Sequence, residues 1–225
     1  MLNPALRENA LHGIKNLNEF EFYERLNGAK ELAKLNSDRK KLLFQFSRGK
    51  HSVSPLGQFD IEQFLLKHLA KYAYDSNHHC IDFEKCSYEY DPAKNGHNIV
   101  KHGLSFSEVV SFSTRFGAMS VPLPEDKEKR FAVFSDLRVG PNEKLEMPLG
   151  NLDDINPIVS IVTHREGGAH LIKMRFISSR RISSKEGECR NDLKNIFKNI
   201  VDDENIRGPF IDDCLKIIKT RLMTA

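Results

Sequence analysis

The stretch from Tyr88 to Glu108 constrains the fold of this 225-residue chain most strongly, because it carries the boundaries of two helices. Asp91-Pro92 is typical of a helix start, with the aspartate as N-cap and the proline at the first helical position. Gly103 is typical of the residue that follows a helix, and Ser105-Phe106-Ser107-Glu108 is a capping box that opens the next one. Ser87–Tyr90 is short and aromatic, which favours a strand. The sequence therefore predicts a strand followed by a tightly connected helical hairpin.

Three apolar segments after the hairpin predict strands: Arg130–Phe134, Ile158–His164 and Leu171–Ser178. The acidic, turn-rich stretch Ser135–Pro157 predicts a long loop or an added hairpin. Gly167-Gly168 suits the turn of a hairpin. Strands grouped between helical regions indicate the α+β class.

The two ends of the chain have helical patterns. Phe22, Leu26, Ala29 and Leu32 fall at helical spacing, and Asp38 is expected to cap a short basic helix through Phe46. Asp60 is expected to cap an amphipathic helix with an apolar stripe made of Ile61, Phe64, Leu65, Leu69 and Tyr72. After Asn191 two apolar stripes, interrupted by Gly208-Pro209, predict two helices. We therefore expect a helical N-terminal extension (1–85), a central domain (86–190) and C-terminal helices (191–225).

Positive charge is concentrated in one region. The net charge of +3 is too small to indicate a nucleic-acid partner by itself. Between His164 and Lys185, however, Glu166 is the single acid among six cations, which are Arg165, Lys173, Arg175, Arg180, Arg181 and Lys185. This local excess predicts an anion-binding surface.

The sequence gives little support for a disulfide-rich, zinc-binding or membrane protein. The four cysteines have no disulfide-rich or zinc-finger spacing, which indicates reduced thiols in a cytoplasmic protein. His78-His79-Cys80 with Cys86 offers metal-ligand types, but the spacing matches no zinc pattern. The sequence shows neither an apolar stretch of ~20 residues nor a secretory signal, so no membrane association is expected. Secretion as an effector by another route stays open.

Residues 86–190 resemble the BrnT family, the toxin halves of bacterial type II toxin–antitoxin pairs. The ordered motifs that carry the resemblance are Tyr90, Asp91-Pro92-Ala93-Lys94, Asn98, Lys101-His102-Gly103, Ser105-Phe106-Ser107-Glu108, Arg130-Phe131, Thr163-His164-Arg165, Arg175-Phe176-Ile177-Ser178-Ser179-Arg180 and Lys185-Glu186. The resemblance implies a RelE-like antiparallel sheet with a helical hairpin, a bacterial endoribonuclease without metal or other cofactor, RNA as substrate, and a BrnA-like ribbon–helix–helix antitoxin as partner. Tyr90 stands where the family usually has tryptophan, and the helical flanks have no counterpart in the compact toxins.

Metal-free RNA cleavage uses the ribose 2′-hydroxyl as nucleophile, so the enzyme must supply a base, an acid and cations for the phosphorane. The expected catalytic residues are His102, Lys101, Arg130, Arg165, Arg180 and Glu186. Arg180 is the main candidate because a planar guanidinium suits phosphate oxygens. Arg130 and Arg165 are expected to converge with it on the scissile phosphate, and Glu186 is expected to act as base or to orient Arg180. The expected RNA-binding residues are Tyr90, Lys94, Lys173, Arg175, Arg181 and Lys185, with Tyr90 stacking on a base.

Structural explanations compete with these roles. Lys101 and His102 also complement the dipole of a helix end, and Glu108 also completes a capping box. Three functional hypotheses follow. The chain is a BrnT-like endoribonuclease, a degenerate toxin-like module that binds RNA or a protein through its basic face, or a toxin whose own helices cover its site.

Overall fold

The computed structural model describes residues 4–75, 77–82, 86–138, 145, 156–166 and 172–222. The helical elements are α1 (Pro4–Lys15), α2 (Glu19–Gly28), α3 (Lys30–Ala33), α4 (Ser37–Ser47), α5 (Pro55–Leu69), η1 (Lys71–Ala73), α6 (Pro92–His102), α7 (Phe106–Phe116), α8 (Glu186–Phe197), α9 (Glu204–Ile217) and η2 (Ile218–Leu222). The strands are β1 (His79–Asp82), β2 (Cys86–Tyr90), β3 (Ala118–Pro122), β4 (Arg130–Leu137), β5 (Asn156–Glu166) and β6 (Ile172–Arg181). The predicted α+β class is confirmed.

The helical hairpin forms as its capping residues predict. The Lys94 amide donates to Asp91 Oδ1 at 3.2 Å, and Gly103 has a left-handed φ of 76°. Ser105 and Glu108 make the reciprocal hydrogen bonds of a capping box. These local signals need no tertiary support, and they fix α6 and α7 directly after β2.

The sheet is mixed, whereas an antiparallel sheet was expected. Its strand order is β1-β2-β6-β5-β4-β3, and β2 pairs with β6 in parallel while the other pairs are antiparallel. The chain leaves β2 through the hairpin and returns through three antiparallel steps, so β6 enters beside β2 in the same direction. The edge strands β1 and β3 were not predicted, because both are short and lie outside the strongly apolar segments.

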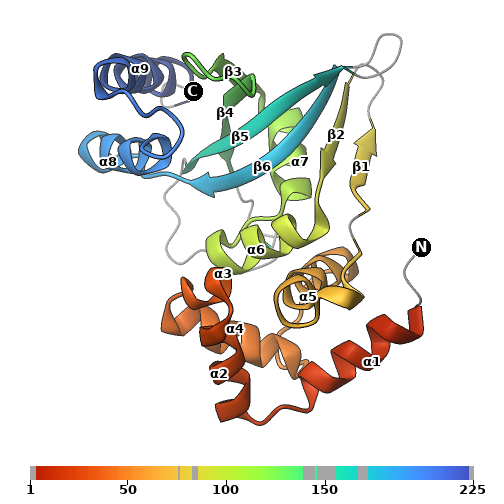
Figure 1. Ribbon diagram of the computed structural model, residues 1–225. Coiled ribbons are helices and arrows are strands. Elements are labelled where there is room, and N and C mark those ends of the chain that lie inside the picture. The colour runs from red at the N-terminus through yellow and green to blue at the C-terminus, as the bar shows by residue number, and fades with distance from the viewer. Residues whose placement is uncertain are drawn as a thin grey trace.

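The two faces of the sheet carry different helices (Figure 1). On one face α7 packs over the sheet, and its Phe106 shares one apolar core with Val162 and Phe176 of the strands. On the other face α8 and α9 pack over a second core that includes Phe134 and Ile161. The part of this second face formed by β2 and the hairpin end of β5 and β6 lies away from α8 and α9.

A β-bulge in β6 changes which side chains share this second face. Ile161 pairs with Ser178 but Val162 pairs with Phe176, so Ile177 has no partner on β5. A bulge residue shifts the alternation by one and re-aims the side chains beyond it. Arg175 and Arg180 therefore lie on the same face, although strict alternation predicts opposite faces for residues five positions apart.

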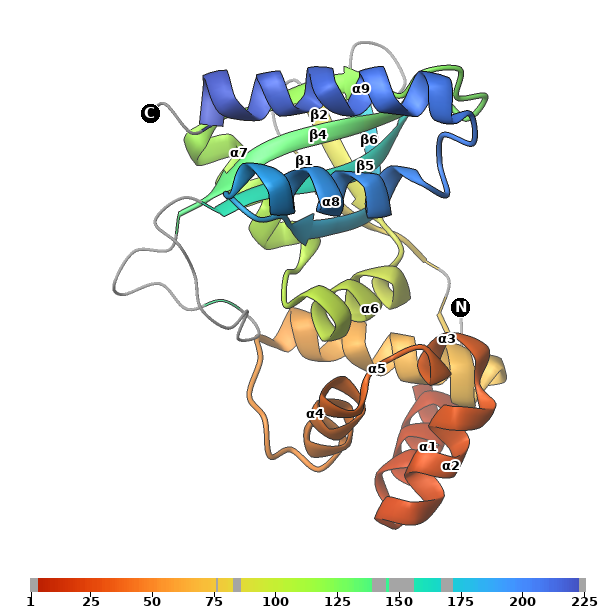
Figure 2. The same ribbon diagram turned by 90° about the vertical axis from the view of Figure 1, so that its left-hand side faces the viewer.

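Helix α6 belongs to two cores at once. Figure 2 shows it between the sheet and α1–α5. Ala93, Ile99 and Val100 of α6 are buried together with α1–α5, and the following turn packs under the sheet. The backbones of α5 and α6 approach so closely at Gly96 that a Cβ there would lie 2.1 Å from the Asp60 carbonyl oxygen. Residues 4–75 are thus bonded into the fold and are more than an appendage to a central domain.

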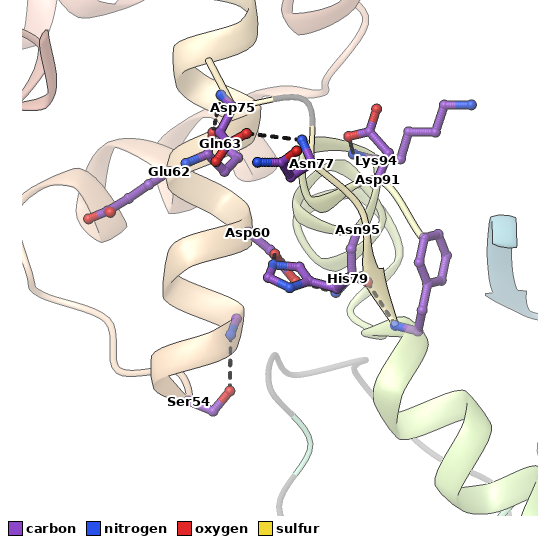
Figure 3. A network of polar contacts seen from close by, with 12 residues as sticks. Ser54, Asp60, Glu62, Gln63, Asp75, Asn77, His79, Asp91, Lys94 and Asn95 are labelled. Atoms are coloured by element: carbon purple, nitrogen blue, oxygen red, sulfur yellow. Dashed lines mark hydrogen bonds and ion pairs between the residues drawn. The ribbon is translucent and has the colours of Figure 1, made fainter. Parts of the chain in front are cut away.

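Asp60 does not cap a helix, contrary to the sequence prediction. Helix α5 begins earlier, with Ser54 as N-cap accepting from the Gly57 amide at 3.1 Å. Asp60 is instead fully buried and accepts a 2.6 Å hydrogen bond from Asn95 Nδ2 (Figure 3). Asn95 Oδ1 in turn accepts from the Phe106 amide at 2.7 Å. This chain of bonds ties α5, α6 and the start of α7 together.

Two further helix predictions need correction. Asn36 rather than Asp38 caps α4, because its side chain reaches the Arg39 amide at 2.9 Å. Pro209 lies inside α9 and does not end it. A proline near a helix start removes only one backbone hydrogen bond, and Phe210 and Ile211 bury the following turn. Gly167-Gly168 and most of Ser135–Pro157 lie outside the described residues.

Among the helices that the structure describes, none has the length and apolar character required to cross a membrane.

Replacing Gly96 with alanine is expected to lower the free energy of unfolding by ~3 kcal/mol, because the added methyl group meets a backbone that cannot move alone. Urea denaturation followed by circular dichroism measures this. Gly13→Ala is the matched control, since a Cβ there meets nothing within 4 Å. The control is expected to stabilise the protein by ~0.5–1 kcal/mol. Equal effects of the two substitutions would contradict the close packing of α5 on α6.

Candidate functional site

A buried carboxylate lies among cations where β2, β5 and β6 meet. Glu89 is only 7% exposed. Lys173 Nζ lies 3.1 Å from its Oε2, and Arg165 Nη1 lies 3.5 Å from its Oε1. Arg175 is the direct cross-strand neighbour of Glu89 on β6. Among the described residues no hydrogen bond reaches Glu89 Oε1, so this oxygen can accept one from a ligand.

The cations keep this carboxylate ionised. Burial by itself would raise the pKa of Glu89, but the hydrogen bond from Lys173 and the charges of Lys173, Arg165 and Arg175 lower the pKa below its usual value. Glu89 therefore carries its negative charge at neutral pH, and in that form it can take a proton.

His78 borders the same cluster from the other side. The Arg175 guanidinium donates a hydrogen bond to His78 Nε2. Burial and the charge of Arg175 lower the pKa of His78, while Glu89 and Asp91 oppose that shift. The imidazole is thus within electrostatic reach of both the carboxylate and the cations.

The segment that presents His78 is fixed by side chains of the N-terminal helices and of α6. The Asp75 amide donates to Gln63 Oε1 at 3.0 Å, and the Asn77 amide donates to Asp75 Oδ1 at 3.0 Å (Figure 3). The Tyr74 hydroxyl is hydrogen-bonded to Asp91, the N-cap of α6. These contacts hold the segment between η1 and β1 against the start of α6.

Lys101 and Arg180 form a second cationic cluster at the end of α6, and His102 lies beside them. Asn98 Oδ1 accepts from the Ser179 amide at 2.9 Å and so fastens α6 to the edge of β6 beyond β2. Burial lowers the pKa of Lys101, and the charge of Arg180 lowers it further. Burial likewise lowers the pKa of Arg180. Two cations that stand close together attract anions.

His102 does not titrate near neutral pH, contrary to expectation. Burial, followed by the charges of Lys101 and Arg180, lowers its pKa to about 3. His102 is therefore neutral at pH 7 and lacks the acidic imidazolium proton that a leaving group would take.

The structure separates the residues that were expected to converge on one phosphate. Arg180 pairs with Val159 on β5, whereas Arg165 lies six positions further along that strand, a rise of roughly 20 Å. Arg130 pairs with Thr163, which places it near the Arg165 end. Lys101, His102 and Arg180 thus form one group, and Arg165 forms another with Lys173 and Arg175.

Arg130 has a structural role. Its guanidinium donates to both carboxylate oxygens of Asp126, at 2.9 and 2.7 Å, and its amide donates to Asp126 Oδ2 at 2.6 Å. This bidentate pair closes the β3–β4 turn, so the planar fork of Arg130 is already occupied.

Glu186 does not orient Arg180, contrary to the sequence prediction. It pairs with Lys219 of the C-terminal helix at 2.8 Å, and this hydrogen bond lowers its pKa. The guanidinium of Arg180 instead donates weakly to the backbone carbonyl of Asp192 at 3.4 Å. No sequence pattern indicated the Glu186–Lys219 pair, because the two residues are distant in the chain and only the packing of α8 brings Glu186 to η2.

The remaining predicted RNA-binding residues differ in accessibility. Lys185 is exposed, and Arg181 donates to Asn156 Oδ1 at 3.0 Å. Lys94 is accessible to solvent near Arg175. Partial desolvation of its amine, together with the charge of Arg175, lowers its pKa. Tyr90 is 1% exposed, and its ring packs edge-on against Phe106. Its burial contradicts the expectation of an open ring face for a base.

Sequence reasoning missed Glu89 and His78. Glu89 sits between two tyrosines in a segment predicted as a short aromatic strand, and the parallel pairing of β2 with β6 brings it beside Arg175. His78 had been weighed only as a metal ligand with Cys80 and Cys86. The described residues contain no cluster of three or more histidine, cysteine, aspartate or glutamate side chains suited to a metal ion, and the Cys86 side chain lies outside them.

Comparison with protein-family models and with curated proteins finds no match for this chain.

The pairing of Arg130 with Asp126 predicts a coupling free energy of about 1–2 kcal/mol in a double-mutant cycle of Arg130→Gln and Asp126→Asn, measured by urea denaturation. Independent effects of the two substitutions on stability would show that Arg130 acts elsewhere.

Proposed function

We propose that this protein is an endoribonuclease that cleaves single-stranded RNA by attack of the ribose 2′-hydroxyl, without a metal ion in the chemical step. The observation that carries the proposal is the buried Glu89, whose Oε1 accepts no hydrogen bond from the described residues while Arg165, Lys173 and Arg175 surround it.

These groups have the properties that the reaction needs. Arg165, Lys173 and Arg175 are cations that can neutralise charge building on the phosphorane. The ionised Glu89 can take the proton from the 2′-hydroxyl, and its Oε1 accepts no hydrogen bond from the described residues that would compete with that donor. Binding of a phosphate to the cations also relieves their pull on Glu89, which makes the carboxylate a better base in the complex.

The second cationic cluster extends the proposed RNA path along β6. The bulge at Ile177 sets Arg175 and Arg180 on one face of the sheet, and four positions of β5 separate their partners Thr163 and Val159. That rise is roughly 13 Å, comparable with about four stacked nucleotides. We propose that one phosphate of the strand is cleaved near Arg175 while another is held by Arg180 and Lys101.

The order of elements supports a fold-family proposal. Strand β2, the α6–α7 hairpin and then β4, β5 and β6 follow one another in the order of the motifs that carry the resemblance to BrnT toxins. We therefore propose a RelE-like fold for residues 86–190. A ribbon–helix–helix antitoxin stays a prediction, which the neighbouring reading frame tests.

A second candidate function is RNA binding without cleavage. The neutral state of His102 and the wide separation of Arg165 from Arg180 favour it, because the catalytic set taken from the motifs is not assembled. In that case Glu89 serves only as a counter-charge within the basic face. The two candidates differ in what loss of the Glu89 charge does to strand scission.

Glu89→Gln is expected to reduce cleavage by ~10²–10⁴-fold while RNA binding strengthens, because one negative charge leaves a cationic surface. Cleavage of short RNA oligonucleotides in EDTA and fluorescence anisotropy measure the two effects. Glu128→Gln is the control, since that carboxylate is exposed on the β3–β4 turn and its loss changes the net charge equally. Stronger binding without any cleavage by the unaltered protein would leave RNA binding as the function.

Arg180→Gln is expected to weaken binding of an RNA of about eight or more nucleotides, which is twice the length of the proposed path. It is also expected to lower the slope of log affinity against log salt by ~0.7. The loss has this size because one phosphate contact is removed. Arg190→Gln removes an equal charge from α8, where Arg190 pairs with Asp212, and is expected to change neither quantity. An equal loss in both variants would point to net charge alone.

A further inference from the structure

We infer that His78, which precedes the toxin-like region in the sequence, is the general acid that protonates the departing 5′-oxygen. The inference rests on the proposed endoribonuclease function and adds a catalytic residue from outside the region that resembles BrnT toxins.

Arg175 links His78 to the proposed base. It is the cross-strand neighbour of Glu89 in the β2–β6 pair, and it donates a hydrogen bond to His78 Nε2. A phosphate that replaces His78 as the acceptor of Arg175 would lie between the imidazole and Glu89. An acid and a base on two sides of one phosphate are what an in-line displacement requires.

The N-terminal helices hold His78 in this position. The Tyr74 hydroxyl is bonded to Asp91, which also accepts from Lys67 Nζ at 3.1 Å, and Gln63 of α5 accepts from the Asp75 amide. Tyr74 and Asp75 are thus fixed four and three residues before His78. The helices that precede the toxin-like region therefore complete the site, which argues against their acting only as its cover.

The chemical step balances with these two groups. The 2′-oxygen forms a bond to phosphorus as the bond from phosphorus to the 5′-oxygen breaks. The 2′-hydroxyl proton passes to Glu89, and a proton from His78 passes to the 5′-oxygen. The products are a 2′,3′-cyclic phosphate and a 5′-hydroxyl, and no further reactant is needed.

The charges around His78 set the expected pH profile. Burial, followed by the charge of Arg175, lowers the pKa of His78, and Arg165 acts in the same direction, while Glu89 and Asp91 oppose the shift. The pKa of Glu89 is also lowered, by Lys173, Arg165 and Arg175 against the effect of burial. The active form needs His78 protonated and Glu89 ionised, so kcat/KM is expected to fall as pH rises through the pKa of His78 and as it falls through that of Glu89. The maximum is expected on the acidic side of neutral.

A substrate with a sulfur leaving group separates the acid from all other roles. A bridging 5′-phosphorothiolate RNA releases a thiolate, which needs no proton. Full-length His78→Gln is expected to lose ~10²–10⁴-fold in kcat on ordinary RNA, with KM little changed, and to cleave the sulfur substrate as fast as the unaltered protein. Glu89→Gln is expected to stay slow on both substrates, because the base is still required.

His164→Gln is the matched control, since His164 is exposed on β5. It pairs with Met174, which packs into the core on the face of the sheet that lies opposite Glu89 and Arg175. It is expected to cleave both substrates normally. Equal losses on the two substrates in His78→Gln, or normal cleavage of ordinary RNA by that variant, would overturn the assignment while leaving the endoribonuclease intact. Failure of the unaltered protein to cleave either substrate would overturn the proposed function and the assignment together.

Discussion

The arrangement of the whole molecule depends on the contact between α5 and α6. Asn95 and Gly96 make it possible together: the glycine lets two backbones meet, and the amide gives the fully buried Asp60 a 2.6 Å hydrogen bond. A buried carboxylate without such a partner would be costly, so the contact also specifies its own register. Through α6 the N-terminal helices, the helical hairpin and the sheet edge become one packed unit. The second cationic cluster is anchored to this helix through the bond from the Ser179 amide to Asn98.

Local chemistry made much of the fold predictable. Asp91, Gly103 and the Ser105–Glu108 capping box act within one helical turn, and their predicted boundaries agree with the structure. The apolar strands β4, β5 and β6 were also predicted, because a buried strand is rich in apolar residues wherever it pairs. Asp60 was assigned wrongly as a cap, since its partner Asn95 is distant in sequence and no local pattern announces a buried pair.

The candidate site was less predictable because it depends on pairing between distant strands. The cations of β6 stood out by composition, but the bulge at Ile177 decides which of them share a face. Glu89 gains its importance only from the strand beside it, and His102 loses its expected role only because burial and neighbouring cations keep it neutral. The order of the motifs thus located the candidate site in the chain, whereas the tertiary contacts decide which of its residues lie together.

The parallel pairing of β2 with β6 has a consequence for how the protein matures. Glu89 is synthesised before Arg175, and the hairpin and strands β3, β4 and β5 separate the two in the sequence. Such non-local contacts are among the slowest to form in folding. A nascent chain that has not yet reached β6 has the carboxylate without the cations of that strand. Under the proposed function, such a chain therefore has no complete site until β6 has paired with β2.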